Sequence, residues 1–135
     1  MTKNENNDSQ NCNKTVALYE RVSRKESLGD ESYGIQSQKI LLEQADLQEG
    51  YTKFLHYTDD GCTGTDMNRP MLKAMCTDIE NGKVSAVFVQ DISRIGRDYL
   101  EVGAMLTDYF PKHGVRFISA SEGIDSEKEE FSMSN

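Results

Sequence analysis

The stretch TVALYERVSRKES, residues 15–27, begins as an apolar, β-branched run and ends in charged residues around a serine. Residues 15–20 are short and apolar enough to form a buried β-strand. Ser23 follows that strand at once, with Arg21 two positions before it and Arg24 directly after it. The sequence therefore predicts a strand whose carboxyl end presents a hydroxyl group between two guanidinium groups.

The rest of the chain alternates between apolar strands, polar loops and helices. Helices are predicted over residues 35–50, from Pro70 to the Asn-Gly pair at 81–82, and near 99–110, and further strands over 52–58, 85–90 and 114–121. In the first helix the apolar residues are expected to form the buried face: Ile35, Leu41, Leu42, Ala45 and Leu47. This alternation predicts an α/β fold with a mainly parallel central sheet of four or five strands, flanked by helices and joined by right-handed crossovers.

A length of 135 residues suits a single domain with a modest core. Residues 1–14 are polar and rich in asparagine, so a flexible tail is expected there. Residues 15–124 form the predicted domain, and residues 125–135 are charged and expected to be a loose tail. No apolar run approaches the roughly 20 residues of a membrane span, and residues 1–14 contain no apolar signal segment. We therefore expect a soluble, cytoplasmic protein.

Composition narrows the classes of function. The three cysteines include no C-x-x-C pair, and His56 and His113 are isolated, so neither a disulfide framework nor a metal site is expected. Each histidine is interpreted as a surface or packing residue. A net charge of −8 argues against a surface built as a whole to attract nucleic acid, but it leaves room for a small basic site.

Polar loops follow the first three predicted strands. In a parallel α/β sheet, the loops that leave the carboxyl ends of the strands lie at one edge, where ligands bind. The candidate groups are Arg21, Ser23 and Arg24 in the first loop, Asp59, Asp60, Thr63, Thr65 and Arg69 in the second, and Asp91, Ser93, Arg94 and Arg97 in the third. Guanidinium groups suit phosphate oxygens and stabilise the charge that builds up when a nucleophile attacks a phosphodiester. The pattern therefore favours a serine that forms a covalent phosphoseryl intermediate.

Simpler interpretations of the same residues remain open at this stage. Ser23 is also typical of a residue that starts a loop or caps a turn. Arg94 and Arg97 could pair with Asp91 and Asp98 on a solvated face, where such pairs contribute little. Other phosphate chemistries fit less well, since the sequence lacks the G-x-x-x-x-G-K-[ST] motif of a P-loop.

Four motifs, in order, resemble the catalytic domain of serine recombinases, the resolvase/invertase superfamily. LYERVS (18–23) resembles the opening strand with its Y-x-R-V-S motif, and YGIQSQ (33–38) the stretch that supplies an active-site glutamine. DDGCTGTDMNRP (59–70) resembles the D-x-x-[ST]-G…R-P segment, and DISRIGRD (91–98) the [DS]-R-x-G-R motif. Residues 102–119 are similar to the helix and strand that follow in large, transposon-type members.

The resemblance implies a resolvase-like fold, a mechanism and a set of site residues. Ser23 would be the nucleophile that attacks the DNA backbone, joining the 5′ phosphate and releasing a 3′ hydroxyl without a metal or a cofactor. Arg21, Arg94 and Arg97 would hold the scissile phosphate, and Arg69 would assist. The supporting and positioning residues would be Tyr19, Gln36, Asp60, Thr63 and Ser93.

The resemblance also implies partners. In the family, a dimerisation helix and a DNA-binding region follow the catalytic domain, and this chain is expected to lack both. The full-length protein would act on a DNA recombination site as a dimer or tetramer, whereas the isolated chain would be a monomer that binds DNA weakly. Two other hypotheses stay open: a flavodoxin-like module that binds a phosphorylated small molecule without covalent DNA chemistry, and a catalytically silent partner that only oligomerises.

Overall fold

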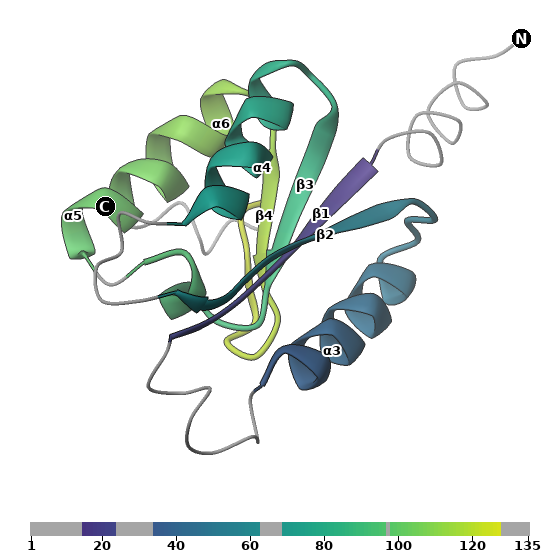
Figure 1. Ribbon diagram of the computed structural model, residues 1–135. Helices are drawn as coiled ribbons and strands as arrows, with labels where there is room; N and C mark the ends of the chain where they lie inside the picture. The colour runs from purple at the N-terminus through teal and green to yellow at the C-terminus, as the bar shows by residue number, and fades with distance from the viewer. Residues whose placement is uncertain (1–14, 24–33, 63–68, 97, 128–135) are drawn as a thin grey trace, which may run out of the picture.

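The computed structural model describes residues 15–23, 34–62, 69–96 and 98–127. At its centre is a five-stranded sheet in the order β2-β1-β3-β4-β5 (Figure 1). The strands are β1 (Thr15–Ser23), β2 (Phe54–Cys62), β3 (Val84–Val89), β4 (Arg116–Ser119) and β5 (Ile124–Asp125). The first four strands pair in parallel, and β5 pairs antiparallel with β4. The predicted α/β class with a mainly parallel sheet is confirmed.

Helices cover both faces of the sheet (Figure 1). One face carries α3 (Ile35–Gln48). The other carries α4 (Pro70–Glu80) and a helical segment made of α5 (Tyr99–Ala104), a π-helical stretch (Met105–Tyr109) and α6 (Phe110–Lys112). A short 3₁₀ turn, η1 (Ile92–Arg94), follows β3. Within the described residues, no helix has the length and apolar character that crossing a membrane requires.

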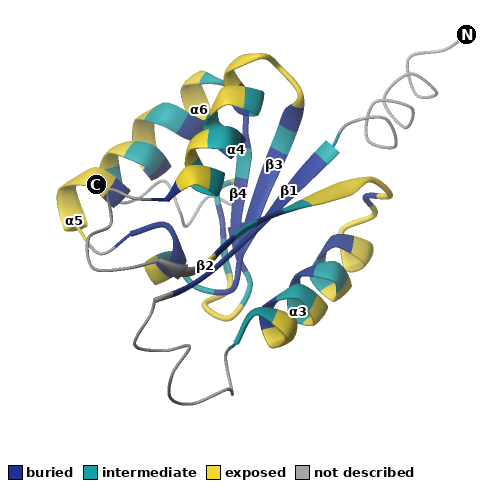
Figure 2. Ribbon diagram, viewed as in Figure 1, coloured by how far each residue is buried: buried dark blue, intermediate teal, exposed yellow. Residues whose placement is uncertain are grey.

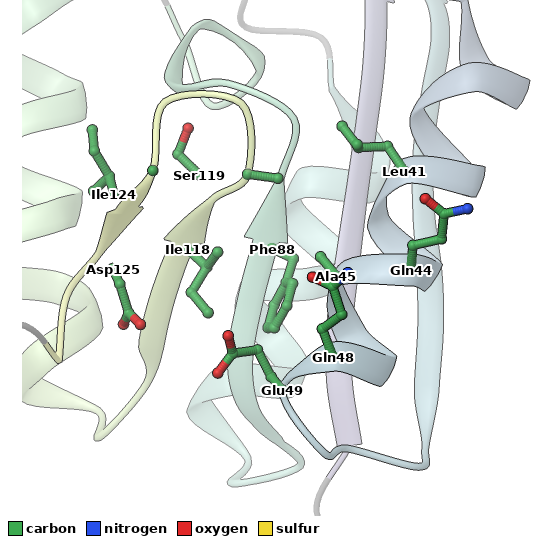
Figure 3. A pocket seen from close by; sticks show the side chains of 12 residues that line it. Leu41, Gln44, Ala45, Gln48, Glu49, Phe88, Ile118, Ser119, Ile124 and Asp125 are labelled. Carbon is green, nitrogen blue, oxygen red and sulfur yellow. The ribbon is translucent and has the colours of Figure 1, made fainter.

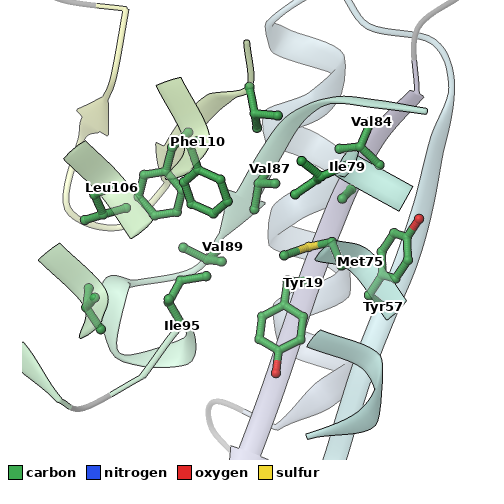
Figure 4. Close-up of a cluster of buried hydrophobic side chains, with 14 residues drawn as sticks. Tyr19, Tyr57, Met75, Ile79, Val84, Val87, Val89, Ile95, Leu106 and Phe110 are labelled. Atoms are coloured by element: carbon green, nitrogen blue, oxygen red, sulfur yellow. The ribbon is translucent and has the colours of Figure 1, made fainter. Parts of the chain in front are cut away.

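Strands β1 and β3 are buried on both faces, whereas the edge strand β2 is exposed over its first residues (Figure 2). Burial on both faces explains the unbroken apolar runs at residues 16–19 and 86–89. The larger apolar cluster lies under α4 and the α5–α6 segment and includes the fully buried Tyr19, Met75 and Phe110 (Figure 4). The ring of Phe110 stacks on that of Phe117, with centroids 5.5 Å apart. A smaller cluster lies on the α3 side and contains Leu42.

The buried face of α3 differs from the prediction. The helix buries Gln38, Leu42 and Asp46, one residue every four positions, and leaves Leu47 71% exposed. Residues four apart share a helix face, so Leu42 and Asp46 both point inward. Leu47 is one position beyond Asp46 and therefore points away from the core. The expectation that Leu47 is buried is therefore wrong, and two polar side chains occupy core positions of this helix instead.

Candidate active site

Three buried arginines meet at the carboxyl edge of the sheet. Arg21 lies near the end of β1, Arg94 ends the η1 turn after β3, and Arg69 directly precedes α4. Their exposed fractions are only 4%, 5% and 7%, in that order. Arginine is almost never buried to this extent without groups that hold it. The predicted meeting of the three loops at one edge is seen for these residues.

Backbone carbonyl groups hold the guanidinium groups in place. Arg21 donates from Nε to the carbonyl oxygen of Arg94 (3.2 Å) and from Nη2 to that of Ser93 (2.9 Å). Arg94 donates in return from Nη1 to the carbonyl oxygen of Arg21 (2.9 Å). Arg69 donates from Nη1 to the carbonyl oxygens of Arg94 and Ile95. A carbonyl acceptor orients a guanidinium group without cancelling its charge, so these contacts are compatible with an edge that binds anions.

Among the described residues, Asp91 lies beside Arg94. Asp91 Oδ1 is 3.7 Å from Arg94 Nε, and it accepts a hydrogen bond from the hydroxyl group of Ser93. The pairing of Arg94 with Asp91 that the sequence left open is therefore present. However, Arg94 is buried, so a fully solvated face does not describe it.

Gln38 binds the backbone of Arg21, a contact that the sequence reasoning missed. Its Oε1 accepts a hydrogen bond from Arg21 N (3.2 Å), and its Nε2 donates to Arg21 O (3.2 Å). The side chain is fully buried. The signal that points to it is its spacing of four residues from Leu42, which places both on the inner face of α3.

Tyr19 and Asp59 anchor α4 to the sheet. The Tyr19 hydroxyl donates to Asp59 Oδ2 (2.8 Å), and Asp59 also accepts from the backbone N–H groups of Met71 (2.9 Å) and Leu72 (3.0 Å) in the first turn of α4. A carboxylate at this position complements the positive end of the helix dipole. Burial, and then the hydrogen bond to Asp59, raises the pKa of Tyr19 far above its ordinary value, so its hydroxyl remains a donor. The anchor fixes the start of α4 and with it the preceding Arg69.

The backbone of Ser23 ends β1 at this same edge. Ser23 lies opposite Cys62 of β2, and the register of the two strands shifts between Val22 and Ser23. Irregularities of this kind are over-represented beside active sites, where they re-aim the chain.

The other predicted supporting residues are distributed unevenly. Gln36, Asp60 and Ser93 have exposed side chains, although the Ser93 carbonyl oxygen accepts a hydrogen bond from Arg21. Thr63 and Arg97 lie outside the described residues. The structure therefore brings together Tyr19, Arg21, Arg69 and Arg94, and adds Gln38 and Asp59 to them.

Two hollows lie near these elements. A groove of about 640 Å³ begins at Arg69 and is lined by Leu72 and Met105. A smaller hollow of about 280 Å³ lies between α3 and β4–β5 and carries the carboxylates of Glu49 and Asp125 (Figure 3). Both carboxylates form ion pairs with Arg116, at 2.9 and 2.7 Å, so the charged groups of this hollow are engaged with one another. The edge that carries Arg21, Arg69 and Arg94 is therefore the better candidate. Across the described part of the chain, no group of histidine, cysteine, aspartate or glutamate side chains is arranged to hold a metal ion.

Comparison with known proteins gives a consistent result. The model of the family "Resolvase, N terminal domain" matches residues 16–133, a stretch that includes every predicted site residue. The N-terminal catalytic domain of TP901-1 integrase is 30% identical with a TM-score of 0.76, over 89% of this chain and 87% of that one. A resolvase family site-specific recombinase from Streptococcus pneumoniae is 31% identical with a TM-score of 0.73, over 89% of this chain and 82% of that one.

A curated phage protein is also similar to part of the chain. Uncharacterized immunity region protein 3 of Bacillus phage phi105 is 36% identical over 73 residues, which make up 54% of this chain and 88% of that protein.

Proposed function

Because the chain belongs to the resolvase family of serine recombinases, we propose that it cleaves and rejoins DNA strands with Ser23 as the nucleophile. Ser23 Oγ loses its proton and attacks a backbone phosphorus, and the bond from that phosphorus to the 3′ oxygen breaks. The 5′ phosphate is then joined to Ser23, and the 3′ oxygen leaves as a hydroxyl. Attack by another 3′ hydroxyl reverses the step after strand exchange. One phosphoester bond replaces another, so the cycle requires no high-energy cofactor.

The observation that carries this proposal is the group of buried arginines at the end of β1. Negative charge on the phosphoryl oxygens is greatest in the transition state of the attack. Arg21 and Arg94 are held in place by each other's backbone carbonyl oxygens before any substrate arrives. Donors that are oriented in advance need no reorganisation during reaction, and a single one contributes roughly 10²–10³-fold in rate.

The remaining residues take supporting roles in this proposal. Arg97 completes the phosphate-binding group, and Arg69 assists from the start of α4. Gln38 and Asp59 act through Arg21 and α4, and they fit the positioning roles better than Gln36 and Asp60, whose side chains are exposed. The residues left as candidates for direct contacts with substrate are Gln36, Asp60, Thr63 and Ser93.

The proposed partner is a DNA recombination site, engaged by a dimer or tetramer. The affinity of proteins for DNA comes largely from lysine and arginine side chains that neutralise phosphates. A domain with a net charge of −8 supplies little of that affinity. DNA binding is therefore a contribution of other parts of the assembly, and this domain contributes the chemistry.

The proposal is tested by strand cleavage in a fusion. The chain is joined to a sequence-specific DNA-binding module, and protein-linked DNA is separated on a denaturing gel. We expect linked DNA for the unsubstituted fusion and for Ser37→Ala, a control at an exposed serine of α3, but none for Ser23→Ala. A folded, DNA-bound Ser23→Ala fusion that still forms linked DNA would contradict the proposal.

A further inference from the structure

His56 lies between two glutamates on the α3 side of the sheet. Its Nδ1 is 2.5 Å from Glu20 Oε2, and its Nε2 is 2.7 Å from Glu43 Oε2. Glu20 is fully buried, and its other oxygen, Oε1, accepts a hydrogen bond from the Thr58 hydroxyl (2.7 Å). These four residues, called the His56 cluster below, join β1, β2 and α3. From the sequence, His56 is interpreted as an isolated surface or packing residue, since its partners are far away along the chain.

The contacts of His56 require two protons. A neutral imidazole carries one N–H, so it donates to only one of the two carboxylates. The second contact is a hydrogen bond only if the ring carries both protons or if one carboxyl group is protonated. Burial raises the pKa of Glu20, which favours a retained proton, although its hydrogen bonds from Thr58 and His56 act in the opposite direction. Without the second proton, a ring lone pair would face a carboxylate oxygen at this close distance. That contact is most unfavourable on the Glu20 side, where the carboxylate is fully buried, and less so at Glu43, whose side chain is 44% exposed.

Among the described residues, charged and aromatic groups of α3 and β2 lie around the cluster. On α3, Lys39 has a favourable electrostatic interaction with Glu20, and Glu43 raises the pKa of Asp46. On β2, the Phe54 ring packs edge-on against the imidazole with centroids 5.3 Å apart, and Asp60 is exposed further along the strand. The contacts of His56 with Glu20 and Glu43 are shorter than any of these, so the proton count within the cluster is expected to decide its interactions.

Helix α3 also contacts the backbone of Arg21, one of the three buried arginines. Gln38, on α3, bonds both the N–H and the carbonyl group of Arg21. Arg21 O also accepts from Arg94 Nη1. Glu43 and Gln38 are therefore two attachments of one rigid helix, the first to the His56 cluster and the second to the backbone of a predicted phosphate-binding residue.

We propose that the His56 cluster is a proton-dependent positioning device, which fixes α3 and thereby keeps Gln38 bonded to Arg21 while the second proton is present. Loss of that proton loosens Glu43 from His56, frees α3 to shift, and weakens the bonds to Arg21. The consequence for DNA cleavage rests on the proposed function. The coupling between the cluster and Arg21 does not depend on it.

Nuclear magnetic resonance of the whole chain tests the coupling without DNA. The imidazole ¹⁵N and Glu20 carboxyl ¹³C shifts are followed with pH, together with the Arg21 backbone amide and the Gln38 side-chain amide. We expect two protons in the cluster at pH 7, and a single midpoint shared by all four signals. Above the midpoint, the Arg21 amide should exchange with solvent at least about tenfold faster. A cluster with one proton at pH 7, or Arg21 and Gln38 signals that do not change with the Glu20 signal, would overturn the proposal.

A charge-removing variant separates positioning from simple packing. Glu43→Gln retains an oxygen that accepts from His56 Nε2 but removes the negative charge that favours the second proton. The midpoints of the Glu20 carboxyl signal and of the Arg21 amide should fall together by about one pH unit or more, a tenfold change in proton affinity. Gln44→Ala, at an exposed position of the same helix, should leave both unchanged. If the Glu20 midpoint moves and that of Arg21 does not, the two attachments are uncoupled and the proposal is wrong.

Discussion

Asp46 is predicted to make the stability of the domain depend on pH. The residue lies on the inner face of α3 and is 1% exposed. In the part of the chain that the structure describes, its Oδ1 atom has no hydrogen-bond partner. Burial, and then the nearby charge of Glu43, raises its pKa from 3.8 to about 6. The folded state therefore holds this proton more tightly than the unfolded state does.

The sign and size of the effect follow from that difference. Stability associated with Asp46 is greatest below its unfolded pKa of 3.8 and is lost as the pH rises through about 6. A shift of about two pKa units corresponds to about 3 kcal/mol at neutral pH. At pH 4 most of this loss of stability is absent, because the carboxyl group of Asp46 is still protonated in the folded state.

Asp46→Asn removes the titration while keeping the shape of the side chain. We expect the free energy of unfolding of the variant, relative to the unsubstituted chain, to rise by roughly 2 kcal/mol between pH 4 and pH 7.5. Urea denaturation at several pH values measures this change, and any constant cost of a buried amide cancels from it. Asp108→Asn, at an exposed helical position, is the control. A difference that stays constant with pH would refute the assignment of a raised pKa to Asp46.

Three further outcomes follow from the site. Arg94→Lys keeps a positive charge but loses the planar fork, so cleavage by the fusion should fall about 100-fold or more with an unchanged circular dichroism spectrum. Asp59→Asn should cost about 1–2 kcal/mol in urea denaturation by weakening the anchor of α4, whereas the exposed Asp60→Asn should stay within about 0.5 kcal/mol. A Cβ atom at Gly96 would lie 3.3 Å from Val102 Cγ2, so Gly96→Ala should lower the free energy of unfolding by about 1 kcal/mol. Equal effects of the two aspartate substitutions, or a Gly96→Ala variant as stable as the unsubstituted chain, would contradict these assignments.

The fold could be predicted because its strands are short apolar blocks separated by polar loops. Parallel strands place their carboxyl ends at one edge, so the meeting of Arg21, Arg69 and Arg94 could be expected from topology alone. The predicted roles of Ser23, Thr63 and Arg97 stay predictions, since no side-chain geometry for them is described.

The sequence did not predict which polar residues are buried, because a pattern of apolar residues identifies only the hydrophobic positions of the core. Gln38 and Asp46 face inward on α3 because helical spacing aligns them with Leu42, although their types suggest a solvated face. Asp59 and Asp60 are adjacent in sequence, and only the register of β2 decides which one is buried. The partners of His56 lie 36 and 13 residues away, so no local pattern reveals the cluster.

The most direct test of the central claim is to locate the bond between protein and DNA. A protease that cuts after glutamate releases residues 21–26, RVSRKE, in which Ser23 is the only hydroxyl-bearing residue. The fusion is allowed to react with a nicked target, the linked complex is digested, and the peptide carrying the nucleotide is identified by mass spectrometry. We expect a 5′-phosphonucleotide on this peptide, and its loss in Ser23→Ala. A nucleotide attached to any other peptide would contradict the claim that Ser23 is the nucleophile.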